Sequence, residues 1–204
     1  MKLTWYGHAC FFIETTDGSV VFDPYMPGSV PGLALPPLTA DAVVCSHGHR
    51  DHAGADAVTL SGQKPGFTLT SIPCFHDDRQ GTLRGENRIT VLEAEGLRLV
   101  HLGDLGHMPD AALLAAIGRP DLLLIPVGGY YTIGPDTAAE LVQALQPRLA
   151  IPMHYRGEGF GYEVIGSAED FTRHFEGVTH WQSNVLDPAE AWTGIVELRC
   201  PVQE

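Results

Sequence analysis

The segment Ser46-His47-Gly48-His49-Arg50-Asp51-His52 constrains this chain more than any other feature. It places three imidazoles and a carboxylate within six consecutive residues, directly after an apolar stretch (42–45) that is typical of a buried strand. Neutral imidazoles and carboxylates are the ligands that zinc, manganese and iron prefer. A solvated polar loop is the alternative interpretation, but it does not explain so many ligand types in one turn. The sequence therefore predicts a metal site on the loop that leaves this strand.

Four more residues of ligand type each stand where an apolar stretch ends: Asp23, His76, Asp104 and His154. A single polar residue at such a place usually only begins a turn. The repetition of one pattern is more informative, because open sheets commonly bind ligands at the carboxyl ends of their strands. We therefore expect these side chains to converge on the loop of residues 47–52.

The order of the elements indicates the fold class. Strand patterns dominate the first half, at residues 2–6, 10–15, 19–22, 42–45, 67–72, 88–93 and 97–102. Helices and strands alternate in the second half, with helices at 109–117, from 134 to a stop at 147, and after 167, and strands at 121–125, 149–152 and 195–199. This order predicts a layered α/β protein with helices covering the sheets, formed by residues 1–204 as a single domain.

Composition limits the classes of partner. The 204 residues have a mean hydropathy of +0.01 and a net charge of −13, which argues against a nucleic-acid or anionic-membrane partner. No apolar run approaches the roughly 20 residues that cross a bilayer, and the first residues lack the pattern of a secretion signal. We expect a cytoplasmic protein that acts on a small molecule.

Six motifs occur in an order that matches a known superfamily. They are Gly7-His8, Asp23-Pro24, His47-Gly48-His49-Arg50-Asp51-His52, His76-Asp77-Asp78, Gly103-Asp104 and Ile151-Pro152-Met153-His154-Tyr155. On these residues the chain resembles the metallo-β-lactamase fold superfamily, in particular its small ascorbate-phosphate-lactonase-like metal-dependent hydrolases. The resemblance implies a four-layer αββα sandwich, in which two sheets pack face to face between outer helices and the site lies along one edge.

The resemblance also implies a set of ligands for two divalent metal ions. Zinc is the expected metal, with manganese or iron as alternatives. One ion would be held by His47, His49 and His76, the second by Asp51, His52 and His154, and Asp104 would bridge the two. Asp23 would support the ligand loop through hydrogen bonds.

Such a centre implies hydrolysis of a small-molecule ester, lactone or phosphoester. Water between two cations has its pKa lowered towards neutrality, so a metal-bound hydroxide would be available as the nucleophile. Asp51 and Asp104 would orient the attacking water, and His8, His107 and Tyr155 are candidates to assist the leaving group. Each of these last three has an ordinary alternative, as a turn histidine, a loop histidine and a core tyrosine.

Two further groups of residues are candidates for substrate contact. The glycine-rich segment 128–134 carries Tyr130 and Tyr131, which suit either a substrate loop or packing between a helix and a strand. Any of Arg79, Arg84 and Arg88, near His76, can bind an anionic substrate or serve as a surface charge. The proline- and glycine-rich segment 27–37 is expected to be a surface loop.

Two other classes of function remain as alternatives. A di-iron redox protein on the same fold is the first, although its flavin-linked members carry a carboxylate where His49 stands and need a flavin domain. The second is a non-enzymatic metal-binding protein, although every expected ligand type is present. A β-lactamase proper and an RNA-processing enzyme are disfavoured by the missing secretion signal and by the charge.

Overall fold

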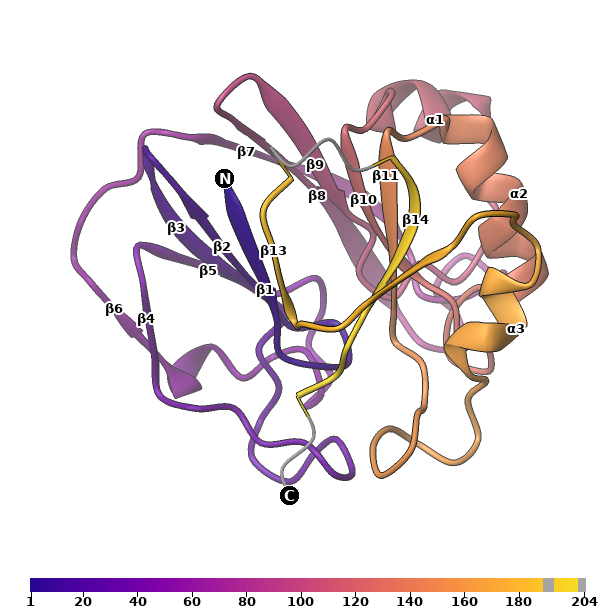
Figure 1. The fold of residues 1–204 in the computed structure, drawn as a ribbon, viewed down its shortest axis with the longest axis horizontal. Coiled ribbons are helices and arrows are strands. Elements are labelled where there is room, and N and C mark those ends of the chain that lie inside the picture. The colour runs from indigo at the N-terminus through magenta and orange to yellow at the C-terminus, as the bar shows by residue number, and fades with distance from the viewer. Residues whose placement is uncertain (189–192, 202–204) are drawn as a thin grey trace.

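Two β-sheets make up most of the structure, a computed structural model that describes residues 1–188 and 193–201 (Figure 1). The strands of the first sheet are β1 (Lys2–Trp5), β2 (Phe11–Thr15), β3 (Gly18–Phe22), β5 (Ala42–Val44) and β13 (Val185–Leu186). Those of the second are β7 (Thr68–Phe75), β8 (Glu86–Ala94), β9 (Leu97–His101), β10 (Leu122–Pro126), β11 (Leu149–Met153), β12 (Thr179–Trp181) and β14 (Gly194–Leu198). The five-stranded sheet has the order β13-β1-β2-β3-β5 and the seven-stranded sheet the order β12-β14-β11-β10-β9-β8-β7.

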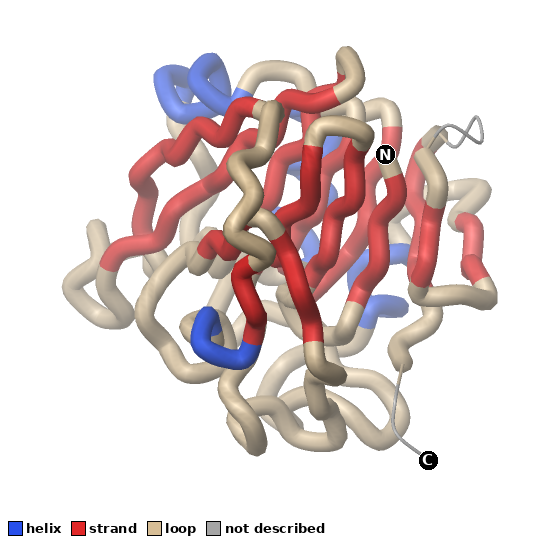
Figure 2. Tube along the Cα trace, turned by 90° about the vertical axis from the view of Figure 1, so that its left-hand side faces the viewer, coloured by secondary structure: helices blue, strands red, loops and turns tan. Residues whose placement is uncertain are grey.

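The outer layers differ on the two sides of the sandwich. The helices α1 (Ala111–Ile117), α2 (Pro135–Leu145) and α3 (Ala168–Thr172) cover the outer side of the seven-stranded sheet (Figure 1). On the opposite side lie β4 (Leu38–Ala40), β6 (Val58–Leu60) and the short 3₁₀ helix η1 (Ala55–Ala57), nearest the viewer in Figure 2. The expected α/β sandwich of the metallo-β-lactamase type is confirmed, but among the described residues α-helices form only one of its two outer layers.

Ring contacts join the two sheets across the core. His101 of β9 stacks on Phe22 of β3 with 5.3 Å between ring centroids, and Phe11 of β2 lies 6.0 Å from the same imidazole. All three side chains are buried. Residues from sequence-distant strands thus share one apolar interior, and its hydrophobic burial is the main force that holds the sheets together.

Strand position explains two features of the sequence. Every residue of β10 and β11 is buried, because these central strands lie between the helices and the facing sheet. β7 continues three residues beyond the expected end at residue 72, through Pro73. A proline is tolerated there because β7 is an edge strand, where one side of the backbone needs no partner in the sheet.

The hairpins and the shortest strands show what local sequence encodes. The turn of Glu95 (φ 54°) and Gly96 (φ 73°) joins β8 to β9 in the left-handed conformation that tight hairpins favour, and β2 and β3 form a second hairpin. The sequence patterns missed β4, β6, β12 and β13, which have only two or three residues each. Such short strands carry too little alternation to be detected.

None of the helices in the described part of the chain has the length and the apolar character needed to cross a membrane.

Replacement of Leu124 by alanine is expected to destabilise the fold by about 2–5 kcal/mol, because this fully buried side chain lies at the centre of β10 and its loss leaves a cavity. Chemical denaturation gives the free energy of unfolding. Leu60→Ala is the control, since Leu60 is 61% exposed and its loss should change stability by less than about 0.5 kcal/mol. Equal effects of the two substitutions would contradict the assigned core.

Candidate metal centre

Strand direction brings the predicted ligands to one edge of the sandwich. β7 and β9 are both antiparallel to β8, and β10 is parallel to β9 and β11, so β7, β9 and β11 all run the same way. His76, Asp104 and His154 follow the carboxyl ends of these three strands. In the other sheet, β3 and β5 are also parallel, and their carboxyl ends lead to Asp23 and to the loop of residues 47–52.

The Asp104 carboxylate lies at the centre of the cluster. Its Oδ2 atom is 3.2 Å from His76 Nε2, 3.3 Å from His154 Nε2 and 3.8 Å from His47 Nε2. Its Oδ1 atom is 3.2 Å from His52 Nε2. The structure therefore brings four imidazoles from three distant segments around one buried carboxylate, as the strand-end pattern predicted.

The ligand atoms of the cluster divide into sets whose members lie within 4.8 Å of one another. These sets are His47, His49 and His76; then His8, Asp51, His52 and His154; then His47, His52 and Asp104. All seven residues expected to hold metal are included, and His8 joins the set expected for the second ion. The first two sets contain the two triads that the resemblance implies, and the third joins His47 and His52 to Asp104.

Several buried ligand atoms lack hydrogen-bond partners, which tests whether a cation fits. Nε2 of His47, His52 and His154 and Oδ1 of Asp104 are buried without such a partner. Buried polar atoms are normally paired, because an unpaired one loses its hydration without compensation. Imidazole nitrogens and carboxylate oxygens facing one another meet the requirements of a divalent transition metal or zinc, and the residues therefore fit a metal ion.

Asp23 holds the ligand loop in place. Its carboxylate accepts hydrogen bonds from Ser46 N at 2.6 Å and Ser46 Oγ at 2.7 Å, and lies 2.7 Å from His52 Nδ1. Burial raises the pKa of Asp23, but the neighbouring His52 outweighs this and the net shift is downward, so the group stays ionised. His52 Nδ1 is thereby fixed as the donor, which leaves Nε2 free to face Asp104.

Asp104 has a second support that the sequence did not reveal. Asn87, fully buried on β8, accepts a hydrogen bond from Asp104 N at 2.9 Å and donates one to Leu102 O at 2.9 Å. Gly103 has φ 55°, and a Cβ atom there would lie 2.4 Å from Asn87 Oδ1 and 2.5 Å from Ser46 Cβ. Only glycine fits this close approach between the two sheets.

At neutral pH the pKa shifts leave two of the imidazoles and the central carboxylate in the states that bind a metal. Burial, followed by the charge of His52, lowers the pKa of His47 to about 3, and burial followed by the charge of His154 lowers that of His8 to about 4. Burial also lowers the pKa of His52, but Asp104 and Asp23 together raise it well above its usual range. The carboxyl pKa of Asp104 is lowered because His154 and His52 outweigh its burial. His47 and His8 are thus neutral and Asp104 is ionised at neutral pH.

A cavity of about 280 Å³ opens beside the cluster. Its walls include ligand residues from both sets and three side chains outside them: Arg84, Tyr131 and Tyr162. Arg84 and Tyr131 are among the residues that the sequence marked for substrate contact. Tyr162 was missed, because nothing in its neighbourhood of the sequence distinguishes it from a surface tyrosine.

The residues expected to assist catalysis occupy different places. His8 lies in the cluster, with its Nε2 atom 3.2 Å from Asp51 Oδ2. Tyr155 does not line the cavity: its buried ring packs against Trp5 at 5.5 Å and against Phe160. The expectation that Tyr155 acts on the leaving group is therefore corrected, because its side chain belongs to the core.

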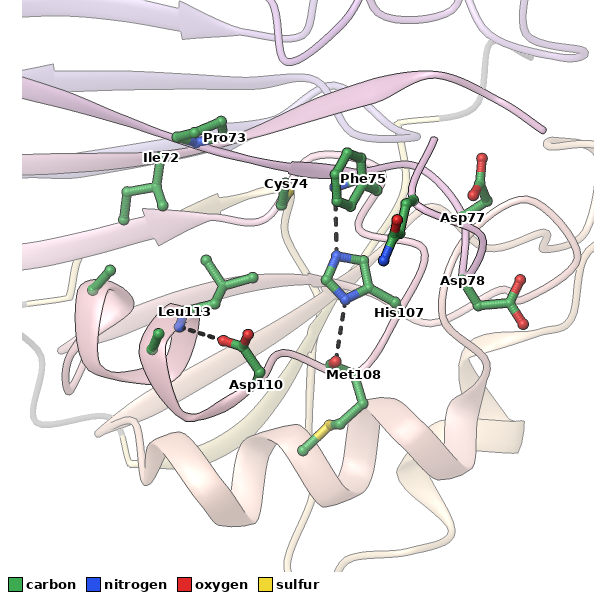
Figure 3. A pocket seen from close by; sticks show the side chains of 13 residues that line it. Ile72, Pro73, Cys74, Phe75, Asp77, Asp78, His107, Met108, Asp110 and Leu113 are labelled. Carbon is green, nitrogen blue, oxygen red and sulfur yellow. Dashed lines mark hydrogen bonds between the residues drawn. The ribbon is translucent and has the colours of Figure 1, made fainter. Parts of the chain in front are cut away.

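Two other histidines stand outside the cluster. His101 is buried and lies 2.9 Å from Ala9 O through its Nε2 atom. His107 belongs to a separate cavity of about 620 Å³ between β7 and α1 (Figure 3). There its Nε2 accepts a hydrogen bond from Phe75 N at 3.4 Å, and its Nδ1 lies 3.1 Å from Met108 O. Both ring nitrogens of His107 are thus engaged away from the metal ligands.

Known proteins share this architecture. Residues 2–154 match the family model described as the β-lactamase superfamily domain. A UPF0173 metal-dependent hydrolase of Archaeoglobus fulgidus is 31% identical over 195 residues, covering 76% of this chain and 83% of its own. A crystal structure from Thermotoga maritima, named as a candidate Zn-dependent hydrolase of the metallo-β-lactamase superfamily, is 34% identical with a TM-score of 0.76, covering 97% of this chain and 99% of its own. Igni18, a metallo hydrolase of Ignicoccus hospitalis with a TM-score of 0.67 and 20% identity, covers 99% of this chain and 96% of its own and shows the shared fold.

Replacement of Asp23 by asparagine is expected to weaken metal binding by about 10- to 100-fold while leaving every ligand in place, because the amide no longer fixes His52 as an Nδ1 donor. Competition with a metal-binding dye measures the affinity. Asp17→Asn, in the hairpin between β2 and β3, is the matched control and should bind as the unchanged protein does. An unaltered affinity in Asp23→Asn would show that this carboxylate does not orient the ligand loop.

Proposed function

Because this chain belongs to the metallo-β-lactamase superfamily and is one of its metal-dependent hydrolases, we propose that it hydrolyses an ester, lactone or phosphoester of a small molecule with two divalent ions, of which zinc is the expected metal. The observation that carries the proposal is the position of Asp104, whose two oxygens face imidazoles of both ligand sets. Asp104 would therefore be within reach of ions held by either set of imidazoles.

His47, His49 and His76 would hold one ion, and Asp51, His52 and His154 the other. When bound, such ions lower the pKa of water towards neutrality and stabilise negative charge on a carbonyl or phosphoryl oxygen. A closed structural site would instead surround a single ion with four protein ligands and no adjoining cavity. The cavity beside this cluster supports a catalytic role.

The protein's own groups position the reactants. Asp51 and Asp104 are carboxylates whose pKa values are lowered, so both remain acceptors that can orient a water molecule by hydrogen bonds. His8 Nε2, 3.2 Å from Asp51 Oδ2, fixes the orientation of that carboxylate. Burial, followed by the charge of Asp51, raises the pKa of Tyr162 well above its usual range, so this phenol stays protonated and cannot serve as a base at neutral pH.

The purified protein is expected to contain close to two divalent ions per chain, and Asp104→Ala and His154→Ala should each lose at least one of them because both remove a central ligand. Hydrolysis of a panel of lactones, aryl esters and phosphodiesters should fall in these variants by at least about 100-fold. Elemental analysis and initial rates provide the two measurements.

His180→Ala is the control for these variants, because His180 is an exposed histidine paired with Glu197 at the surface. It should keep both the metal and the activity. A preparation with one ion per chain and full activity would contradict the dinuclear proposal. An iron-only protein with redox activity would favour the di-iron alternative.

A further inference from the structure

Three loops meet at the cavity of the metal centre, and each contributes one side chain that the metal sets do not use. These side chains are Arg84, Tyr131 and Tyr162. The loops of Arg84 and Tyr131 are also tied by backbone hydrogen bonds to segments that carry metal ligands, and Tyr162 is held by its own hydroxyl bond to Ser29 O. The three side chains therefore have defined positions beside the ligands, which is the property of a substrate-binding wall.

The loop of Arg84 is held at both ends. It starts after His76, and His76 N donates a hydrogen bond back to Gly85 O at 3.1 Å. The Asp77 carboxylate lies inside the loop and accepts four backbone hydrogen bonds, of 2.7–3.0 Å, from Arg79, Gly81, Leu83 and Arg84. These bonds fix the backbone of Arg84 with respect to the ligand His76.

The side chain of Arg84 reaches across the cavity to the next loop. Its Nη2 atom donates a hydrogen bond to Tyr130 O at 2.8 Å, and its Cζ atom lies 5.8 Å from the centre of the Tyr131 ring. No carboxylate of the described residues forms an ion pair with it. A guanidinium has five N–H donors, so most of those of Arg84 remain available to a ligand.

Tyr131 and Tyr162 form the apolar part of the wall. Their ring centroids lie 5.8 Å apart at an angle of 70°, and the Tyr162 ring lies 5.7 Å from that of His8. The Tyr162 hydroxyl donates to Ser29 O at 2.6 Å and also interacts with Asp51, so it is already engaged and the ring is the part available to a ligand. The segment of Tyr131 is joined to the Asp104 loop by a bond from Ile133 N to Leu105 O at 2.8 Å.

From these contacts we infer that the substrate is a small anionic compound, whose carboxylate or phosphate group binds Arg84 while its body lies against the rings of Tyr131 and Tyr162. The inference rests on the proposed hydrolysis and adds the class of substrate. Two divalent ions and Arg84 outweigh the carboxylates of Asp51 and Asp104, so the loaded cavity is positive within a chain of net charge −13. Its volume of about 280 Å³ is at the small end for ligand sites.

A pair of esters that differ in one charge tests the role of Arg84. The metal-loaded protein is assayed with 4-nitrophenyl acetate, which is neutral, and with the mono-4-nitrophenyl ester of succinic acid, which carries a free carboxylate. In Arg84→Gln the KM for the succinate ester should rise by about tenfold or more, because a charge-assisted hydrogen bond is lost. The KM for the acetate, both kcat values and the metal content should change by less than about twofold.

Two further variants complete this test. Arg84→Lys retains the charge and should recover part of the affinity for the succinate ester. Arg88→Gln removes an exposed arginine that does not line the cavity, and both esters should behave as with the unchanged protein. Equal effects of Arg84→Gln on the two esters, or no effect on either, would overturn the assignment.

Calorimetric titration with inorganic phosphate separates this inference from the proposed function. Arg84→Gln should bind phosphate at least about tenfold more weakly than the unchanged protein. If Arg84→Gln weakens phosphate binding while neither ester is hydrolysed, the anion site at Arg84 is supported and the proposed hydrolysis of these esters is wrong. If both proteins bind phosphate equally, the anion site is wrong, whatever the hydrolytic result.

Discussion

The structure of the site depends on one buried carboxylate, Asp104, surrounded by imidazoles. A lone ionised carboxylate without compensation is costly in a protein interior, and its neighbours include nitrogens that have no hydrogen-bond partner. Under the proposed function, cations bound by these atoms would remove this cost. The convergence of ligand-type residues from distant segments would then be linked to metal binding, because a metal bound by the folded protein adds to its folding free energy.

The surrounding chain bears strain to maintain this arrangement. His8, Asp23 and His154 all have positive φ values, of 52°, 44° and 54°. Non-glycine residues in this region typically cost about 1–3 kcal/mol each and persist where the surrounding structure over-determines them. Here the supports are hydrogen bonds such as those of Asp23 to Ser46, and the core packing between the sheets. These backbone conformations therefore lower the stability of the folded chain, and they place the candidate metal-binding groups and their support where the cluster needs them.

The sequence predicted which side chains converge, because each follows an apolar strand and strand direction then collects them at one edge. It could not predict Asn87 or Tyr162, whose roles depend on contacts with residues far away in the chain. Tyr155 shows the opposite error. It directly follows a ligand, His154, yet its ring packs on Trp5 in the core, because proximity along the chain does not determine where a side chain points. The shortest strands were missed because two or three residues carry no readable alternation.

The central claim is that the cluster holds two cations on either side of Asp104, and anomalous diffraction from crystals of the metal-loaded protein tests it most directly. The account predicts two anomalous peaks, one in contact with His47, His49 and His76 and the other with Asp51, His52 and His154, both in contact with the carboxylate. A single peak coordinated without Asp104, or peaks only at other residues, would contradict it.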